Sequence, residues 1–97
     1  MPGMVASEPS PTMRIDKFLW FARLTRSRSA AQALSESGAI RLDGRRVDRA
    51  HTPVRTGSVI AMVQNGAVRV LRVEKLPVRR GPATEAALLC TDLVEQS

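Results

Sequence analysis

Arginine is the residue type whose number and spacing could do chemistry in this chain, and that chemistry is the binding of phosphate. Thirteen of the fifteen basic residues are Arg, and the formal net charge of the 97 residues is +6. Residues 14–55 alone hold ten basic and four acidic side chains, a net charge of +6. A planar guanidinium makes paired hydrogen bonds to phosphate and stacks on bases. The pattern therefore predicts a polyanionic partner, either a nucleic acid or an anionic membrane surface.

Nine residues of this segment are the candidate nucleic-acid contacts. Three cluster where two helices are expected to meet, and the N-terminus of the second helix would add a positive dipole end with free N–H groups. Four others follow on the first expected strand, its turn and the connection after it. The candidates are Arg14, Lys17, Arg23, Arg26, Arg28, Arg41, Arg45, Arg46 and Arg49. Trp20 and Phe21 could stack on bases, although packing is the more common use of scarce aromatic residues.

Catalytic and metal-binding patterns are weak by comparison. The acids of the basic segment, among them Asp16 and Asp43, lie among arginines and fit surface charge partners better than a general acid–base pair. One His (His51) and one Cys (Cys90) are too few for a structural zinc site, and no Gly-rich phosphate loop occurs. The sequence thus predicts no enzyme, no catalytic residues, no cofactor and no metal.

Composition also predicts the cellular compartment of the protein. A single Cys fits a reducing, cytoplasmic compartment. No apolar run approaches the roughly 20 residues of a membrane span, so no membrane partner is expected. The length suits one small domain and excludes a two-domain enzyme.

Two short helices are expected to position the first group of arginines. Apolar residues at 3.6-residue spacing predict a helix of about ten residues from Met13. Ser27 or Thr25 is a plausible N-cap for a second helix over residues 28–37, which Gly38 would end. The expected inner faces are formed by Ile15, Phe18, Leu19 and Ala22 in the first helix and by Ala30, Ala31 and Leu34 in the second.

Strands follow these helices. Residues 40–42 alternate in polarity and lead through the turn dipeptide Asp43-Gly44 to Val47, after which 48–58 is expected to be irregular. The β-branched runs 59–63 and 68–73, separated by Asn65-Gly66, predict a hairpin.

The whole pattern predicts an α+β fold in which two helices pack on a small, mostly antiparallel sheet. Residues 1–12 are expected to be a disordered leader, residues 13–76 the domain with its hairpin, and residues 77–97 a basic linker and a C-terminal helix. That helix is predicted from Pro82 to about Glu95, with Cys90 facing the core.

Three segments in this order resemble the S4 domain, a family of RNA-binding modules. They are Arg14–Trp20, Thr25–Ala31 and Gly38–Val47, and the resemblance extends over about residues 13–64. The family resemblance implies the αL RNA-binding motif, with RNA held on a basic face of helix and strand.

Trp20 and the segment Arg79–Leu89 narrow the resemblance to a ribosome-associated, stress-related branch of this family. That branch implies ribosomal RNA, and with it tRNA, as ligand. It also implies the large ribosomal subunit as partner in the rescue or recycling of stalled translation. A monomer is expected. The alternative left open is a DNA-binding helix-turn-helix protein, since two short helices joined by a basic turn also fit that class.

Overall fold

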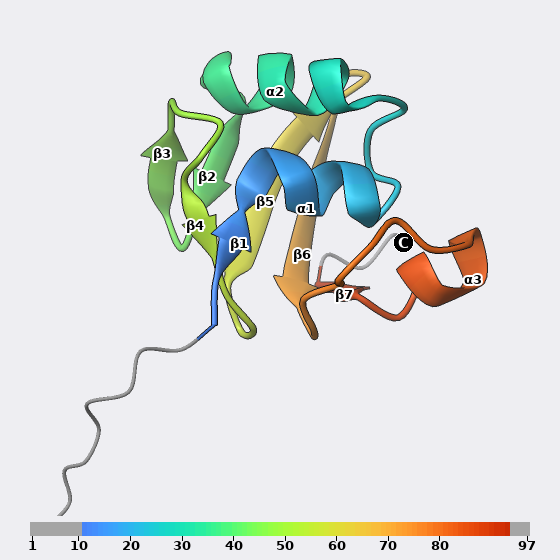
Figure 1. Ribbon diagram of the computed structural model, residues 1–97. Coiled ribbons are helices and arrows are strands. Elements are labelled where there is room, and N and C mark those ends of the chain that lie inside the picture. The colour runs from blue at the N-terminus through green and yellow to red at the C-terminus, as the bar shows by residue number, and fades with distance from the viewer. Residues whose placement is uncertain (1–10, 94–97) are drawn as a thin grey trace, which may run out of the picture.

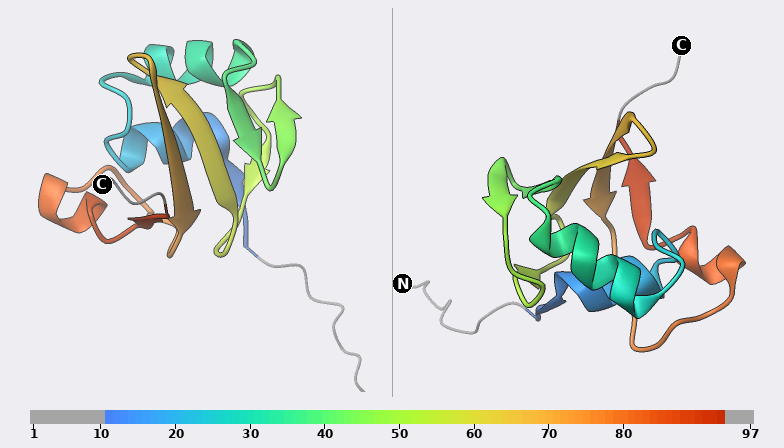
Figure 2. Two further views of the ribbon diagram at one scale, coloured as in Figure 1. Left: turned by 180° about the vertical axis from the view of Figure 1, so that it is seen from behind. Right: turned by 90° about the horizontal axis from the view of Figure 1, so that it is seen from above.

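Five antiparallel strands form the main sheet, in the order β3-β2-β5-β6-β7. The computed structural model describes residues 11–93. Helices α1 and α2 both lie on one face of the sheet, and the view from behind shows β5 and β6 uncovered by them on the other face (Figures 1 and 2). The strands are β2 (Ile40–Leu42), β3 (Arg45–Val47), β5 (Val59–Gln64), β6 (Ala67–Val73) and β7 (Cys90–Asp92). The predicted α+β class, two helices on an antiparallel sheet, is confirmed.

Helix α1 (Ile15–Phe21) forms because its apolar residues recur at helical spacing. Ile15, Phe18 and Leu19 are fully buried, as predicted. The helix begins two residues later than predicted, since Met13–Arg14 is strand β1 and pairs with β4 (Pro53–Val54). The segment 48–58, expected to be irregular, therefore contains one short strand.

Helix α2 (Arg28–Glu36) begins at the predicted residue and ends one residue before the predicted end. The Oγ of Ser27 accepts a hydrogen bond from the N–H of Ala30 at 3.0 Å, which identifies Ser27 as the N-cap. Beyond the last turn, Gly38 has a φ of +85°, the left-handed conformation that glycine adopts without strain. Ala31 is buried under the helix, whereas Ala30 and Leu34 are half-buried.

Strand alternation divides the sheet into a buried and an open face. Ile40 pairs with Val47 and Ile60 with Leu71, and all four side chains are buried beneath the helices. Arg41 is exposed on the opposite face. The predicted hairpin between β5 and β6 is confirmed, with positive φ at both Asn65 and Gly66.

The C-terminal region departs from the prediction. Helix α3 (Ala83–Ala86) starts where expected, but residues 90–92 are strand β7, paired with the edge of β6. A helix running to Glu95 is therefore wrong, and Cys90 is a half-buried strand residue next to the core. Residues 94–97, and the predicted leader apart from Pro11 and Thr12, lie outside the described residues. Within residues 11–93, no helix has the length and apolar character needed to cross a membrane.

Candidate nucleic-acid interface

Asp16 joins two of the predicted contacts, Arg14 and Arg28. Arg14 donates from Nε and Nη2 to the two carboxylate oxygens of Asp16, both at 3.0 Å. Arg28 Nε, at the start of α2, lies 3.4 Å from Oδ2, and the N–H of Lys17 donates to Oδ1 at 2.7 Å. The side chains of Arg14 and Arg28 stay 48% and 41% exposed. This Asp16 cluster (Asp16, Arg14, Arg28) thus fixes two guanidinium groups while leaving them open to a ligand.

The carboxylate of Asp16 is itself buried, with 1% of the residue exposed. Burial alone would raise its pKa. The hydrogen bond from Arg14 and the positive charges of Arg28 and Arg14 outweigh burial, so the pKa of Asp16 lies below its usual value. Asp16 is the charge partner of Arg14 and Arg28, but it is buried, so only the expected surface position is wrong.

Aromatic residues of α1 are engaged with the protein. The ring centroids of Trp20 and Phe21 are 5.7 Å apart, and Lys17 Nζ lies 5.6 Å from the Phe21 centroid. Arg80 lies over the Trp20 ring at 5.2 Å and donates from Nε to the Trp20 carbonyl at 3.2 Å. Trp20 therefore anchors the segment before α3, which agrees with the packing alternative.

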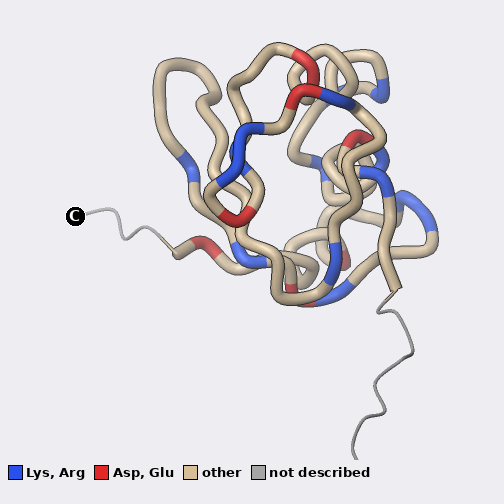
Figure 3. The backbone as a smooth tube through the Cα atoms, turned by 90° about the vertical axis from the view of Figure 1, so that its left-hand side faces the viewer, with Lys and Arg blue, Asp and Glu red and all other residues tan. Residues whose placement is uncertain are grey.

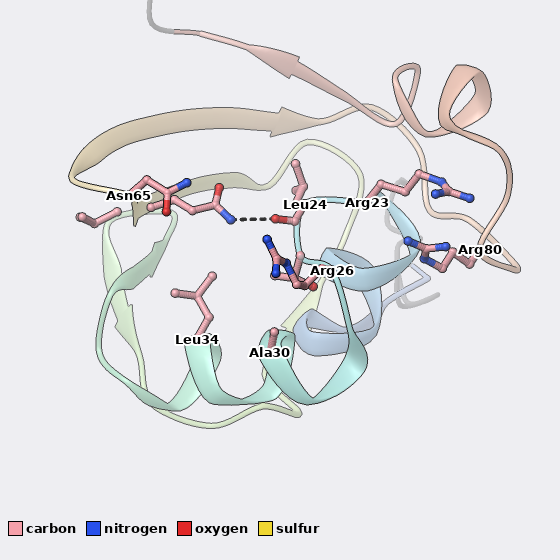
Figure 4. A pocket seen from close by; sticks show the side chains of 10 residues that line it. Arg23, Leu24, Arg26, Ala30, Leu34, Asn65 and Arg80 are labelled. Atoms are coloured by element: carbon pink, nitrogen blue, oxygen red, sulfur yellow. Dashed lines mark hydrogen bonds between the residues drawn. The ribbon is translucent and has the colours of Figure 1, made fainter.

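Arg23 and Arg26 line one groove together with Arg80. The groove lies between the α1–α2 connection, α2 and the β5–β6 turn. Figure 4 shows Arg23 and Arg80 at one end, Arg26 between, and Asn65 at the other end. Arg23 donates from Nε to the carbonyl of Gly81 at 2.9 Å and has a φ of +60°. Sequence reasoning left Arg80 out because it lies outside the basic segment; the pair Arg79-Arg80 was the available signal.

The arginines of β2 and β3 form a third group. Arg41 and Arg46 are paired across the two strands and both are exposed. The guanidinium of Arg46 packs against Gly38, at the end of α2. Arg45 and Arg46 line a second hollow together with Arg55.

Arg49 lies on an exposed turn beside the start of α1. The carbonyl of Arg49 accepts hydrogen bonds from Thr52, and the next residues hold α1 through backbone bonds from Ile15 to Thr52 and from Asp16 to Ala50. This turn therefore lies near the Asp16 cluster.

The nine predicted contacts thus fall into groups rather than one continuous plane. The groups surround α1, the start of α2 and the β2–β3 hairpin. Seen from the side of β3, basic positions lie in several separate parts of the backbone, with acidic positions among them (Figure 3). One of these acids, Asp43, is used locally, because its Oδ1 accepts the N–H of Val59 at 2.9 Å.

The residues that could serve in catalysis or metal binding, among them His51 and Cys90, do not form a site in the described part of the chain. His51 lies exposed on a turn. Burial raises the pKa of the Cys90 thiol to about 11, with Arg69 opposing the shift and the charges of Asp92 and Glu74 adding to it. Within residues 11–93, no three His, Cys, Asp or Glu side chains are grouped as metal ligands would be.

Comparison with known proteins agrees with this geometry. The S4 domain family matches residues 13–60, the part that contains all nine predicted contacts. Heat shock protein 15 of Escherichia coli K12 is 31% identical over 88 residues, which cover 91% of this chain and 65% of that protein. A homologue from Haemophilus influenzae is 32% identical over 77 residues, which cover 79% of this chain and 58% of that protein. The chain thus spans less than two thirds of the length of these relatives.

A solved structure gives the same result in three dimensions. The trimeric structure of Vibrio cholerae heat shock protein 15 superposes with a TM-score of 0.78 and 30% sequence identity, covering 84% of this chain and 82% of that one. The fold, the match to the S4 domain and the sequence identity all indicate the same family. The chain belongs to the heat shock protein 15 family of S4-domain proteins.

Proposed function

We propose that this chain is a non-enzymatic protein that binds structured RNA through the arginine groups around α1, the start of α2 and the β2–β3 hairpin. The observation that carries the proposal is a coincidence of two features. The part that matches the S4 domain, residues 13–60, is also the part that holds the whole net positive charge. Contacts of this kind read phosphate position and helix shape rather than base sequence.

The exposed surface of α2 disfavours the DNA-binding alternative. A recognition helix lies in the major groove and presents its exposed side chains to the bases and flanking phosphates. Here the exposed residues of α2 include Gln32, Ala33 and Glu36, and its one basic residue, Arg28, is paired with Asp16. Competition between duplex DNA and ribosomal RNA distinguishes the two functions, since a preference for one duplex DNA sequence would favour the alternative.

The finer proposal is that the RNA is ribosomal RNA or tRNA on the large ribosomal subunit, in the rescue or recycling of stalled translation. Its support is membership of the heat shock protein 15 family together with the resemblance of residues 79–89 to the ribosome-associated branch. This role would place the protein in the cytoplasm.

Sedimentation of the full chain with separated ribosomal subunits at two salt concentrations tests this role. We expect the protein to travel with the large subunit at low salt and to be released as salt rises, because phosphate contacts exchange with counterions. If the protein travels with neither subunit, the ribosomal role is wrong, and binding to isolated RNA then tests the coarser function.

The oligomeric state is a separate proposal. The sequence predicts a monomer, whereas the related Vibrio cholerae structure is trimeric. On this chain Val63 and Val68 are about half exposed and paired across the β5–β6 hairpin, a small apolar surface of the kind that self-association uses. Analytical ultracentrifugation decides the question: a trimer at micromolar concentration contradicts the predicted monomer.

A further inference from the structure

The groove that Arg23, Arg26 and Arg80 line is positively charged. Its volume is about 650 Å³, which is in the range of sites that hold one small ligand. Three of its lining residues are arginines, and no Asp or Glu lines it. Three neighbouring positive charges repel one another unless an anion lies between them. The charge of the groove therefore favours phosphate as part of what it binds.

Two of these arginines are already oriented by the protein. Arg23 is held through its Nε by the carbonyl of Gly81, and Arg80 through its Nε by the carbonyl of Trp20. Within the described part of the chain, the terminal Nη atoms of both arginines make no hydrogen bond. They can donate to a phosphate without losing a bond, and the side chains lose little further freedom on binding.

The remainder of the groove suits a base. Leu24 and Leu34 line the groove and are half-buried, so together they offer an apolar surface. Gln64 Nε2 donates to the carbonyl of Leu24 at 2.8 Å, which leaves its Oε1 as an acceptor. Asn65 adds a second amide at the end of the groove (Figure 4). Amides of this kind can hydrogen-bond to the edge of an unpaired base.

We infer that the groove takes one unpaired nucleotide of the bound RNA. The base lies on Leu24 and Leu34, and its phosphate meets the arginines. This inference rests on the proposed RNA-binding function and deepens it, because it adds a contact to single-stranded RNA. It also extends the RNA-binding surface beyond the S4 match at residues 13–60, to Arg80 and the β5–β6 turn.

Three RNAs with the same paired sequence test the inference with the unaltered protein. One is a fully paired duplex, one carries a single-nucleotide bulge, and one carries the same bulge without its base. We expect the bulged RNA to bind about tenfold more tightly than the other two, because an accommodated base adds its own contact energy. Equal affinity for all three overturns the inference and leaves the proposed function standing. No binding to any of them overturns both.

Two variants of α2 identify the groove as the site. Ala30 and Ala33 lie on the same helix, but only Ala30 lines the groove, whereas Ala33 is exposed outside it. We expect Ala30→Glu to remove the tenfold preference for the bulge while the affinity for the paired duplex stays within about twofold of that of Ala33→Glu. Retention of the bulge preference in Ala30→Glu contradicts the site.

A second pair of variants tests the arginine beyond the S4 match. Arg80→Ala should weaken binding of the bulged RNA more than binding of the paired RNA. Arg79→Ala removes the same charge from a neighbouring side chain that is paired with Glu85 outside the groove, so it is the matched control. If both variants weaken both RNAs equally, Arg80 acts through net charge alone and the inference fails. Circular dichroism and chemical denaturation of Arg80→Ala and Arg79→Ala check that both variants keep the fold.

Discussion

Asp16 Oδ2 lies 3.4 Å from Nε of Arg28, the first residue of α2, although the two are twelve positions apart in the chain. The same carboxylate holds Arg14 in front of α1. One buried acid therefore connects the start of α1 to the start of α2 and holds two proposed RNA contacts. Stability and RNA binding are linked through this cluster, which makes it the first place to test.

Asp16→Asn should destabilise the fold by about 1–3 kcal/mol, because it replaces a buried carboxylate oxygen that accepts from an arginine with an amide NH₂ group that cannot accept. Glu36→Gln is the matched control: it also neutralises one acid, but on the exposed side of α2. Chemical denaturation measures both. Equal unfolding free energies for the two variants would contradict the structural role of Asp16.

The same substitution, Asp16→Asn, should make the free energy of unfolding less dependent on pH in the acidic range. The pKa of Asp16 is lower in the folded protein than in the unfolded chain, where it is about 3.9. Its contribution is therefore complete above that value and is lost as the pH falls through the lower folded pKa. We expect the difference in unfolding free energy between wild type and Asp16→Asn to be constant from about pH 7 to 5 and to shrink below about pH 4. A difference that grows on acidification would show that the shift has the opposite sign.

Gly38→Ala should lower stability and RNA affinity together. A Cβ at φ +85° is strained by about 1–2 kcal/mol, and it would also displace the guanidinium of Arg46. Gly57 has a similar φ of +93° but open space around it, so Gly57→Ala isolates the strain. Denaturation and RNA titration of both variants separate the two effects. The role given to Arg46 is wrong if Gly57→Ala loses as much RNA affinity as Gly38→Ala.

The helices and tight turns could be predicted because their causes are local. The spacing of Ile15, Phe18 and Leu19 defines the buried face of α1, and Ser27 and Gly38 bound α2 through bonds and dihedral angles within a few residues of each other. The Asn65-Gly66 hairpin is of the same kind. None of these elements needs knowledge of the remaining chain.

The strand at residues 90–92 could not be predicted, because its conformation depends on a partner strand that is distant in the sequence. The Ala-rich spacing after Pro82 fits a helix, but residues 90–92 complete the open edge of β6 instead. Backbone hydrogen bonds to a preformed strand outweigh a weak helical preference. The two-residue strands β1 and β4 were missed for the same reason.

The candidate site was predictable in its composition but not in its arrangement. Charge counting identifies the basic segment, yet nothing in the sequence shows that Asp16 is buried or that Arg41 and Arg46 share a face. The position of Arg80 over Trp20 joins residues 60 apart in the chain, and only the folded structure brings them together. Long-range pairs of this kind carry most of the geometry of the site.

The most direct test of the central claim compares two double variants that each remove two arginines. Arg26→Ala/Arg45→Ala changes the proposed RNA surface, whereas Arg72→Ala/Arg79→Ala removes the same charge from exposed positions outside residues 13–60. Equilibrium binding to ribosomal RNA is measured over a range of salt. We predict that the first variant loses about tenfold or more in affinity and reduces the slope of log K against log salt by about 2, while the control stays near wild type. Equal losses in the two variants would contradict the claim that these residues form the RNA-binding surface.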